Sequence, residues 1–424
     1  MDQKEKTKIF VSAYACEPGL GSEIGVGWHW VLEMSRHFDL WVLTRESNRH
    51  TIEPWIARHP EYSHIRFLYY DLPRWARWWK RGMRGVRLYY NLWQWRTDPI
   101  VRRTMRDNGI AVYHLLTYGN ALWPASSYGQ KQVFVWGPIG GVDTIPADYT
   151  SHYGWKWRLI EAVRRMVVAA LPLNRGFQHR CRDASLILCK SHSMREAIKE
   201  EYRHKAVMMT DVAVETQHAQ DFQRQRQPDE PTVRFLMVGR LDAWRGFDLA
   251  VEALAKALRE NGQLRLDILG EGSDRKRITE SIKRLGIGKK VTLHGKVPMD
   301  TCLQMMADSD VVLNPCLKEG AVTTAFDAMT LGKALIGIDT GGYTRYFNQD
   351  YAILIAKDKR EKVVEKLAEA ILRLADKRLR EDMGHKAKEA ALHFSWQTKG
   401  DEIAATLRQV VGQKNGQQSD NGHL

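Results

Sequence analysis

The order of the apolar runs constrains the fold of this chain more than any other feature. Short β-rich runs bounded by turn residues alternate with helical segments over residues 8–189, and the alternation begins again over residues 233–355. This pattern predicts βαβ units, in which parallel strands form a sheet with helices on both faces. The 424 residues give enough chain for two or three such domains. We therefore expect an α/β protein with two doubly wound, Rossmann-like domains.

The strand-like runs mark the two series. In the first they are 8–14, 40–44, 66–70, 111–116, 132–136 and 185–189. In the second they are 233–238, 264–269, 290–293, 311–314, 333–338 and 352–355. The polar segment 218–231 ends in a proline and is typical of a linker. Tandem sheets of this kind bind ligands in a crevice at the carboxyl ends of their strands, so we expect an interdomain cleft.

These runs set the expected domain boundaries. Residues 1–220 form the first domain and residues 232–392 the second. Residues 393–412 are expected to form a C-terminal helix. Residues 413–424 are polar or glycine except for Leu424, so we expect them to be a disordered tail.

Charge and cysteine usage narrow the class of protein. Lys and Arg number 64 against 50 Asp and Glu, a net charge of +14, and residues 1–200 carry 29 basic and 18 acidic side chains. An anion-seeking surface is therefore expected in the first half, for nucleic acid, acidic lipid or a charged substrate. The five cysteines form no C-x-x-C pair, so neither a disulfide framework nor a zinc site is indicated. No apolar run approaches the roughly 20 residues of a membrane span, and we expect a cytoplasmic location.

One segment of the first half mixes cations with aromatic rings. Residues 74–106 hold ten basic side chains and one acid, interleaved with seven Trp and Tyr residues, and residues 155–173 repeat the mixture on a smaller scale. Such residues suit a membrane interface, where rings lie at headgroup depth and cations meet anionic lipid. Stacking on sugar rings or on single-stranded nucleic acid uses similar residues, and an ordinary basic helix face is a further interpretation. We favour an anionic membrane surface, and no motif indicates nucleic acid.

The first strand-like run leads into a glycine turn. Gly19, Gly21, Gly25 and Gly27 precede or begin a helical pattern, and backbone N–H groups at such a helix start suit a phosphate or carboxylate. The spacing G-x-G-x-x-x-G is one residue longer than the dinucleotide fingerprint. An NAD-dependent oxidoreductase is therefore a weaker hypothesis, and a plain tight turn is another.

The second series carries the strongest signal. Gly239 and Arg240 follow a strand, and Arg245 comes five residues later, just before a helix. Two guanidinium groups beside a helix N-terminus form a clamp for a diphosphate. Glycine turns follow the next two strands around Gly272 and Gly295. Farther on, the carboxylates Glu319 and Asp327 stand eight residues apart.

These motifs resemble the retaining nucleotide-sugar glycosyltransferases of family 4, which have the two-domain GT-B fold. The resemblance rests on GRLDAWRG, LGEGSDR, LHGKVP, the acid-x7-acid run and DTGG, all in the second half. It implies that residues 393–412 return to the N-terminal domain. It also implies that Arg240 and Arg245 grip the donor diphosphate, that Glu319 contacts the transferred sugar, and that His114 lies near the bond that breaks.

The same resemblance implies a donor-binding set in the glycine turns and at the acid-x7-acid run. This set comprises Gly19, Gly21, Ser22, Gly239, Gly272, Gly295, Lys296, Val297, Gly320, Ala321, Val322, Thr323 and Asp327. The resemblance implies no metal and no cofactor beyond the nucleotide sugar. Asp308-Ser309-Asp310 spells the D-x-D metal signature of another transferase class, but it directly precedes a strand, so we interpret it as a turn.

Three departures from the family pattern bear on activity. Arg245 replaces the usual lysine, Asp327 replaces the usual glutamate, and Arg345 stands where the family has an acid. The implied function is transfer of a sugar from a nucleoside diphosphate to a glycan or lipid-linked acceptor in polysaccharide or lipopolysaccharide assembly, on the inner face of the cytoplasmic membrane. The alternative from another class is a non-catalytic relative that binds glycans or membrane surfaces. A lone histidine at a strand end is more often structural, and this interpretation of His114 stays open.

Overall fold

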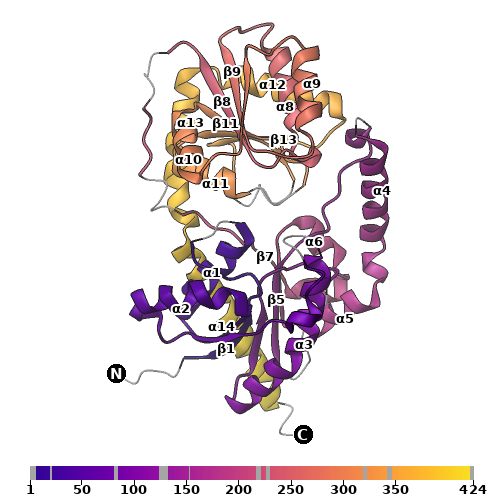
Figure 1. The fold of residues 1–424 in the computed structure, drawn as a ribbon, viewed down its shortest axis with the longest axis vertical. Helices are drawn as coiled ribbons and strands as arrows, with labels where there is room; N and C mark the ends of the chain where they lie inside the picture. Colours follow the sequence, from indigo (N-terminus) through magenta and orange to yellow (C-terminus); the bar gives the residue numbers. More distant parts are fainter. Residues whose placement is uncertain are drawn as a thin grey trace. The chain divides into compact units, whose positions relative to one another are not determined.

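The structure is a computed structural model of the whole chain that divides into two compact units. It describes residues 6–19, 22–80, 85–123, 132–151, 153–215, 221–225, 230–318, 322–340 and 346–420, with the backbone alone at Ser22, Lys156, Val322 and 415–420. The first unit comprises residues 1–142, 170–211 and 396–424, and the second comprises residues 143–169 and 212–395. Each unit is built on its own parallel sheet (Figure 1).

The first unit has a seven-stranded sheet in the order β3-β2-β1-β4-β5-β6-β7, and every neighbouring pair is parallel. Its strands are β1 (Lys8–Ser12), β2 (Asp39–Thr44), β3 (Arg66–Tyr69), β4 (Val112–Leu115), β5 (Val133–Ile139), β6 (Leu186–Cys189) and β7 (Ala206–Met208). The six predicted runs of the first series coincide with β1 to β6. The three-residue edge strand β7 was not predicted, because so short a run carries no periodicity.

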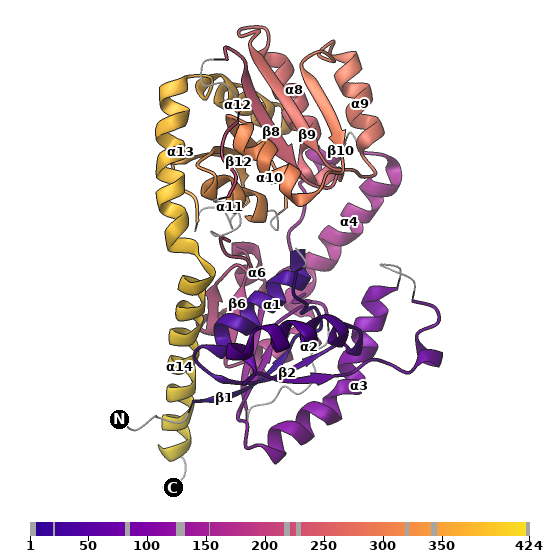
Figure 2. The same cartoon turned by 60° about the vertical axis from the view of Figure 1, so that its left-hand side comes forward.

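Helices cover both faces of this sheet (Figure 2). They are α1 (Ser22–Ser35), α2 (Arg49–Arg58), α3 (Val86–Asp107), α5 (Arg175–Asp183), α6 (His192–Ala197) and α14 (Trp396–Asp420). Ile9 and Val11 of β1 pack in one core with residues of α1 and α14. On the opposite face, Gln94 of α3 bonds the Ser12 hydroxyl. Successive side chains of a strand point to opposite faces, so β1 is buried on both sides.

The second unit has a six-stranded parallel sheet in the order β10-β9-β8-β11-β12-β13. Its strands are β8 (Val233–Val238), β9 (Leu264–Leu269), β10 (Val291–Gly295), β11 (Val311–Asn314), β12 (Ala334–Asp339) and β13 (Ala352–Ala356). Its helices are α4 (Trp155–Ala169), α8 (Phe247–Ala257), α9 (Arg275–Arg284), α10 (Met299–Asp308), α11 (Val322–Thr330), α12 (Arg360–Arg373) and α13 (Lys377–Ala391). All six predicted strands are present, so the expected doubly wound α/β fold is confirmed in both units.

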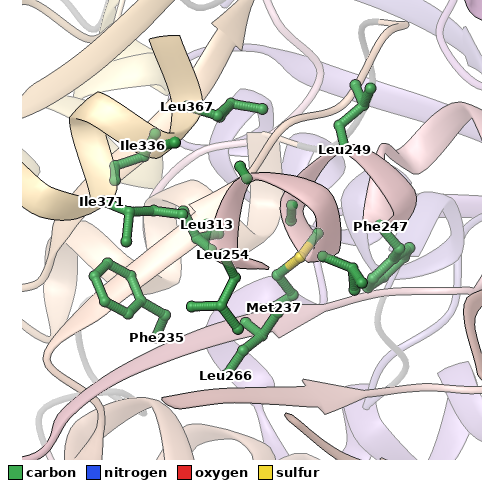
Figure 3. Packing of buried hydrophobic residues seen from close by; sticks show 14 of the residues in the cluster. Phe235, Met237, Phe247, Leu249, Leu254, Leu266, Leu313, Ile336, Leu367 and Ile371 are labelled. Atoms are coloured by element: carbon green, nitrogen blue, oxygen red, sulfur yellow. The ribbon is translucent and has the colours of Figure 1, made fainter. Parts of the chain in front are cut away.

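Buried aliphatic side chains hold β8 against its covering helices. Phe235 and Met237 on β8 pack with Leu254 of α8 and Ile371 of α12 in one cluster (Figure 3). All four side chains are at most 2% exposed. Burying a side chain of this size contributes about 1.5–3 kcal/mol. This core fixes the carboxyl end of β8, from which the arginine motif begins.

The second unit also takes a segment from the first half of the sequence. Residues 143–169 were predicted within the first domain, but the structure groups them with the second unit. The physical reason is burial, because Ile145, Tyr149 and Tyr153 lie in the core cluster of the second unit. The Tyr149 hydroxyl donates to the Asp358 carbonyl at 2.7 Å.

Helix α14, yellow in Figures 1 and 2, belongs to the first unit. Trp396 stacks on His29 of α1 at 4.9 Å between ring centroids, and Lys399 donates to the Thr210 carbonyl at 2.8 Å. The helix continues to Asp420, so residues 413–420 are helical where we expected a disordered tail. Lys414 anchors this end by donating to the Gln132 carbonyl, and residues 421–424 lie outside the described part.

Candidate functional site

The arginine motif forms the loop between β8 and α8. Gly239 follows β8 with φ +152°, and Gly246 precedes α8 with φ +73°. A side chain at Gly246 is excluded by space as well as by φ, because its Cβ would lie 2.0 Å from the Pro315 carbonyl oxygen. The glycine thus lets the loop pass close to the end of β11. Leu317, beyond β11, donates its backbone N–H to the Trp244 carbonyl at 2.9 Å.

The two arginines of this loop lie in different environments. The Arg240 side chain is 73% exposed and pairs with Asp242 at 2.9 Å. The Arg245 guanidinium lies 4.4 Å from the centroid of the Trp244 ring, and a Cβ at Gly239 would be 3.6 Å from one of its nitrogens. Its Nε is buried and has no hydrogen-bond partner among the described residues. Arg245 is therefore fixed in place and has an N–H donor that no described residue uses, whereas Arg240 is exposed to solvent and paired with Asp242.

Two further predicted loops pack against the arginine loop. Gly270 donates its N–H to the Gly295 carbonyl at 2.7 Å, and Leu241 donates to the Glu271 carbonyl at 3.0 Å. A Cβ at Gly272 would lie 2.4 Å from the Leu241 carbonyl oxygen, so this glycine allows the loops to approach. The loops after β8, β9 and β10 therefore meet at the carboxyl edge of one sheet, as their motifs predicted.

Two other residues of the predicted donor-binding set lie at the carboxyl ends of these strands and are accessible to solvent. Lys296 is exposed and Val297 is partly exposed, directly after the positive-φ residue Gly295. They are accessible to a ligand at this edge. This position agrees with the predicted loop near the base, although the contact itself stays a prediction.

The acid-x7-acid run is described only in part. Glu319, Gly320 and Ala321 lie outside the described residues, as does Arg345. Val322 begins α11, and Thr323 is exposed in the first turn of that helix. Asp327 lies on α11 and is partly exposed; its charge adds to burial in raising the pKa of Cys302 to about 11.

The glycine turn of the first unit leads into α1. Gly19 has φ +72° with open space around it, Gly21 lies outside the described residues, and Ser22 begins α1. Glu23, one residue into the helix, accepts a 2.8 Å hydrogen bond from the Tyr118 backbone N–H. Burial, the largest cause, raises the pKa of Glu23, although Lys190 opposes this effect. Glu23 could not be identified from sequence, because its hydrogen bond joins residues 95 positions apart.

His114 lies in the core of the first unit. Its side chain is 0% exposed, Nε2 bonds the Gly137 carbonyl at 2.7 Å, and the ring packs edge-on to Trp30 at 5.9 Å. Burial lowers its pKa to about 4, so the ring is neutral near pH 7. With no exposed surface, the ring cannot touch a sugar in this conformation. Its place within β4 favours the structural interpretation of His114, and a role near the transferred sugar stays a prediction.

The two aspartates of the D-x-D sequence make structural contacts within the second unit. Asp310 accepts a 2.8 Å hydrogen bond from the Arg234 backbone N–H and pairs with Arg224 at 2.9 Å. Asp308 accepts from the Gln225 backbone N–H at 2.7 Å. Within the described ranges, no group of three His, Cys, Asp or Glu side chains converges as a metal site.

The second half of the chain matches a known family. Residues 219–390 match the family model described as glycosyl transferases group 1. The chain is 24% identical over 257 residues to the alpha-D-kanosaminyltransferase of Streptomyces kanamyceticus, a match that covers 60% of this chain and 64% of the relative. It therefore spans slightly less than two thirds of that relative's length.

Solved structures share the fold at low sequence identity. Sucrose-phosphate synthase from Thermosynechococcus elongatus matches with a TM-score of 0.59 at 15% identity, covering 96% of this chain and 100% of that one. Anabaena Alr3699/HepE, solved in complex with UDP and glucose, matches with a TM-score of 0.53 at 16% identity, covering 95% and 100%. Together with the two parallel sheets, these likenesses show the GT-B fold.

Proposed function

We propose that this chain, whose residues 219–390 match the family model of glycosyl transferases group 1, transfers a sugar from a nucleoside diphosphate to a hydroxyl of a glycan or lipid-linked acceptor. The observation that carries the proposal is the loop after β8. It holds Arg245 against Gly239 and Trp244 and presents Arg240 beside it, at the carboxyl edge of a parallel sheet. Two such cations supply the charge and the bidentate N–H donors that a diphosphate accepts.

The proposed reaction retains the configuration of the sugar. The bond from the anomeric carbon to the diphosphate breaks, and the acceptor oxygen bonds to the same face of that carbon. The acceptor proton passes to an oxygen of the departing phosphate. In this scheme Arg240 and Arg245 stabilise the leaving diphosphate, Glu319 positions the sugar, and Asp327 contacts the ribose. Preorganised donors of this kind are commonly worth about 100- to 1,000-fold in rate each.

Metal independence is part of the proposal, because the two guanidinium groups supply positive charge where other transferases use a cation. The test is a panel of UDP- and GDP-sugars incubated with the protein and candidate acceptors in excess EDTA, with released nucleotide measured by chromatography. We expect turnover of at least one donor in EDTA. Turnover that appears only after Mg²⁺ or Mn²⁺ is added would overturn metal independence. Donor binding without release of nucleotide would favour the non-catalytic alternative.

We further propose that the protein works at the inner face of the cytoplasmic membrane in polysaccharide or lipopolysaccharide assembly. None of the helices in the described residues is long and apolar enough to cross a bilayer. The support is exposed aromatic surface: Trp75, Trp78 and Trp95 of the first unit are 79%, 77% and 70% exposed, within the basic segment 74–106. Binding to anionic vesicles should weaken as salt rises, because the Debye length shortens to about 3 Å at 1 M. No binding at low salt would overturn this location.

A further inference from the structure

Helix α4 exposes its apolar side to solvent. Seven large apolar side chains of α4 are between 42% and 70% exposed: Trp155, Trp157, Leu159, Ile160, Val163, Met166 and Val167. At 100° per residue all of them except Trp157 form one stripe that covers about 140° of the helix surface, and Trp157 lies about 60° beyond it. A surface helix of a globular protein ordinarily buries such a stripe. In α4 the stripe has no covering side chains among the described residues of the second unit.

The opposite, polar side of α4 contacts the second unit. Glu161 is 6% exposed, and its Oε1 accepts from Lys318 Nζ at 2.5 Å. Arg164 donates to the Asp143 carbonyl at 3.0 Å, and Arg165 donates to the Ile145 carbonyl at 3.1 Å. These contacts fix which face of α4 points outward. The exposure of the apolar stripe therefore follows from the way the polar side chains are bound.

The net positive charge of α4 indicates which kind of surface it binds. Residues 155–169 contain four basic side chains and one acid, and that acid, Glu161, is buried against Lys318. The accessible charge of the helix is therefore positive. An apolar stripe that contains Trp and lies between cations fits the headgroup region of a bilayer with anionic lipids. A second copy fits less well, because a two-fold interface through α4 brings cations against cations.

Two residues that hold α4 in place, Lys318 and Tyr153, also lie next to or contact the predicted donor-binding segments. Lys318 is the residue before Glu319, and its carbonyl accepts from the Cys316 thiol at 2.8 Å. Tyr153, just before α4, donates its hydroxyl to the Ala243 carbonyl at 2.9 Å, in the arginine loop. The Arg277 guanidinium lies 5.4 Å from the centre of the Tyr153 ring. A change in the position of α4 therefore acts on the arginine loop and on Lys318, the last described residue before the acid-x7-acid run.

From these contacts we infer that α4 is a membrane-docking helix that lies in the surface of an anionic bilayer, and that docking raises donor affinity through Glu161 and Lys318. The coupling rests on the proposed transferase function, and the docking rests on the proposed membrane location. Allosteric couplings of this kind usually change affinity by about 5-fold or more.

Docking is tested by co-sedimentation with vesicles of phosphatidylglycerol and phosphatidylcholine, and with phosphatidylcholine alone. The variant Leu159→Ser/Met166→Ser removes two stripe residues, and Leu392→Ser/Met299→Ser is its control at side chains 62% and 58% exposed in the same unit. We expect the wild type and the control to bind the anionic vesicles, and the stripe variant to bind about tenfold or more weakly. Equal binding by both double variants would overturn the docking role. So would a wild-type dimer without vesicles that the stripe variant alone disrupts.

Coupling is tested with Glu161→Gln, which removes one charge of the buried pair and leaves the stripe intact. We expect anionic vesicles to lower the donor KM of the wild type about 5-fold or more with little change in kcat. Glu161→Gln should bind vesicles normally but show no such fall. An equal fall in both proteins, or none in the wild type, would overturn the coupling.

The two proposals can fail separately. If no donor turns over, the same comparison is made with the Kd of UDP and of GDP, with and without vesicles. Absence of nucleotide binding under both conditions would contradict the proposed function and the coupling together. The sedimentation result would still decide whether α4 docks on a membrane.

Discussion

His114 shows at the residue scale why sequence position alone does not assign chemistry. The family resemblance implies a histidine near the bond that breaks, whereas a lone histidine at a strand end is more often structural. In the structure it lies within β4, and burial lowers its pKa to about 4. By contrast, Arg240 and Arg245 could be placed from sequence, because glycines on both sides fix the course of their loop.

The buried imidazole makes stability depend on pH. The folded chain leaves His114 neutral down to about pH 4, whereas the unfolded chain protonates it near its usual pKa of about 6.5. Between these values the unfolded state binds more protons, so stability falls as pH falls. We expect the stability advantage of the wild type over His114→Gln to shrink by about 3 kcal/mol between pH 7.5 and pH 4. Denaturant unfolding at several pH values measures this difference, and a constant difference would contradict the buried, neutral state.

Three glycines of the second unit differ in whether φ is positive and in whether there is space for a Cβ atom. Gly246 has φ +73° and a blocked Cβ position, Gly286 has φ +70° and open space, and Gly262 has open space without a positive φ. Replacement by alanine should cost about 3 kcal/mol at Gly246 and about 1 kcal/mol at Gly286, and leave Gly262 within about 0.5 kcal/mol. Thermal unfolding of the three variants checks the order. Equal effects at Gly246 and Gly286 would show that contact with Pro315 is unimportant.

At the scale of elements, a buried ionic network joins α8, α9 and α12. Asp248 of α8 is 4% exposed and accepts from Arg277 at 3.1 Å and from Arg360 at 3.2 Å. Arg360 also pairs with Glu252, and Arg277 with Asp274. The network begins two residues after Gly246, so it holds the helix whose N-terminus supports the arginine loop.

Removing the shared carboxylate should destabilise the second unit strongly. In Asp248→Asn, two guanidinium groups lose their common charged partner inside the protein, and breaking a buried pair costs about 3–5 kcal/mol. Asp382→Asn is the control, because its 2.7 Å pair with Lys386 has side chains about half exposed. Such a pair contributes about 0.5 kcal/mol or less. Urea unfolding compares the two, and losses of similar size would contradict the structural role of the network.

Most elements could be predicted because each strand is a local apolar run. The strands β8, β9 and β11 match their predicted ranges residue for residue. The attachment of α4 could not be predicted, since the Lys318–Glu161 pair joins residues 157 positions apart. The amphipathic pattern of α4 likewise does not tell which of its faces contacts the protein. That information comes from the partners of Glu161, Arg164 and Arg165.

At the scale of the whole molecule, the sequence predicted two domains in order, whereas each compact unit is assembled from separate segments. The chain enters the second unit at residue 143, returns at 170, enters again at 212 and leaves at 396. Such returns depend on long-range burial, for example of Tyr149 and Tyr153. The glycine and arginine motifs do not depend on them, so the donor loops could be identified before the units were known.

Binding of the donor diphosphate by the arginine loop is tested by isothermal titration of the protein with UDP and with GDP in EDTA. The wild type is compared with Arg240→Ala and with Arg265→Ala, which removes an exposed arginine at the opposite end of the sheet, on β9. Because Arg240 is 73% exposed, its loss should leave the melting temperature unchanged. We expect Arg240→Ala to bind nucleotide about tenfold or more weakly, and Arg265→Ala to bind like the wild type. Equal affinity in all three proteins would contradict this role of the arginine loop.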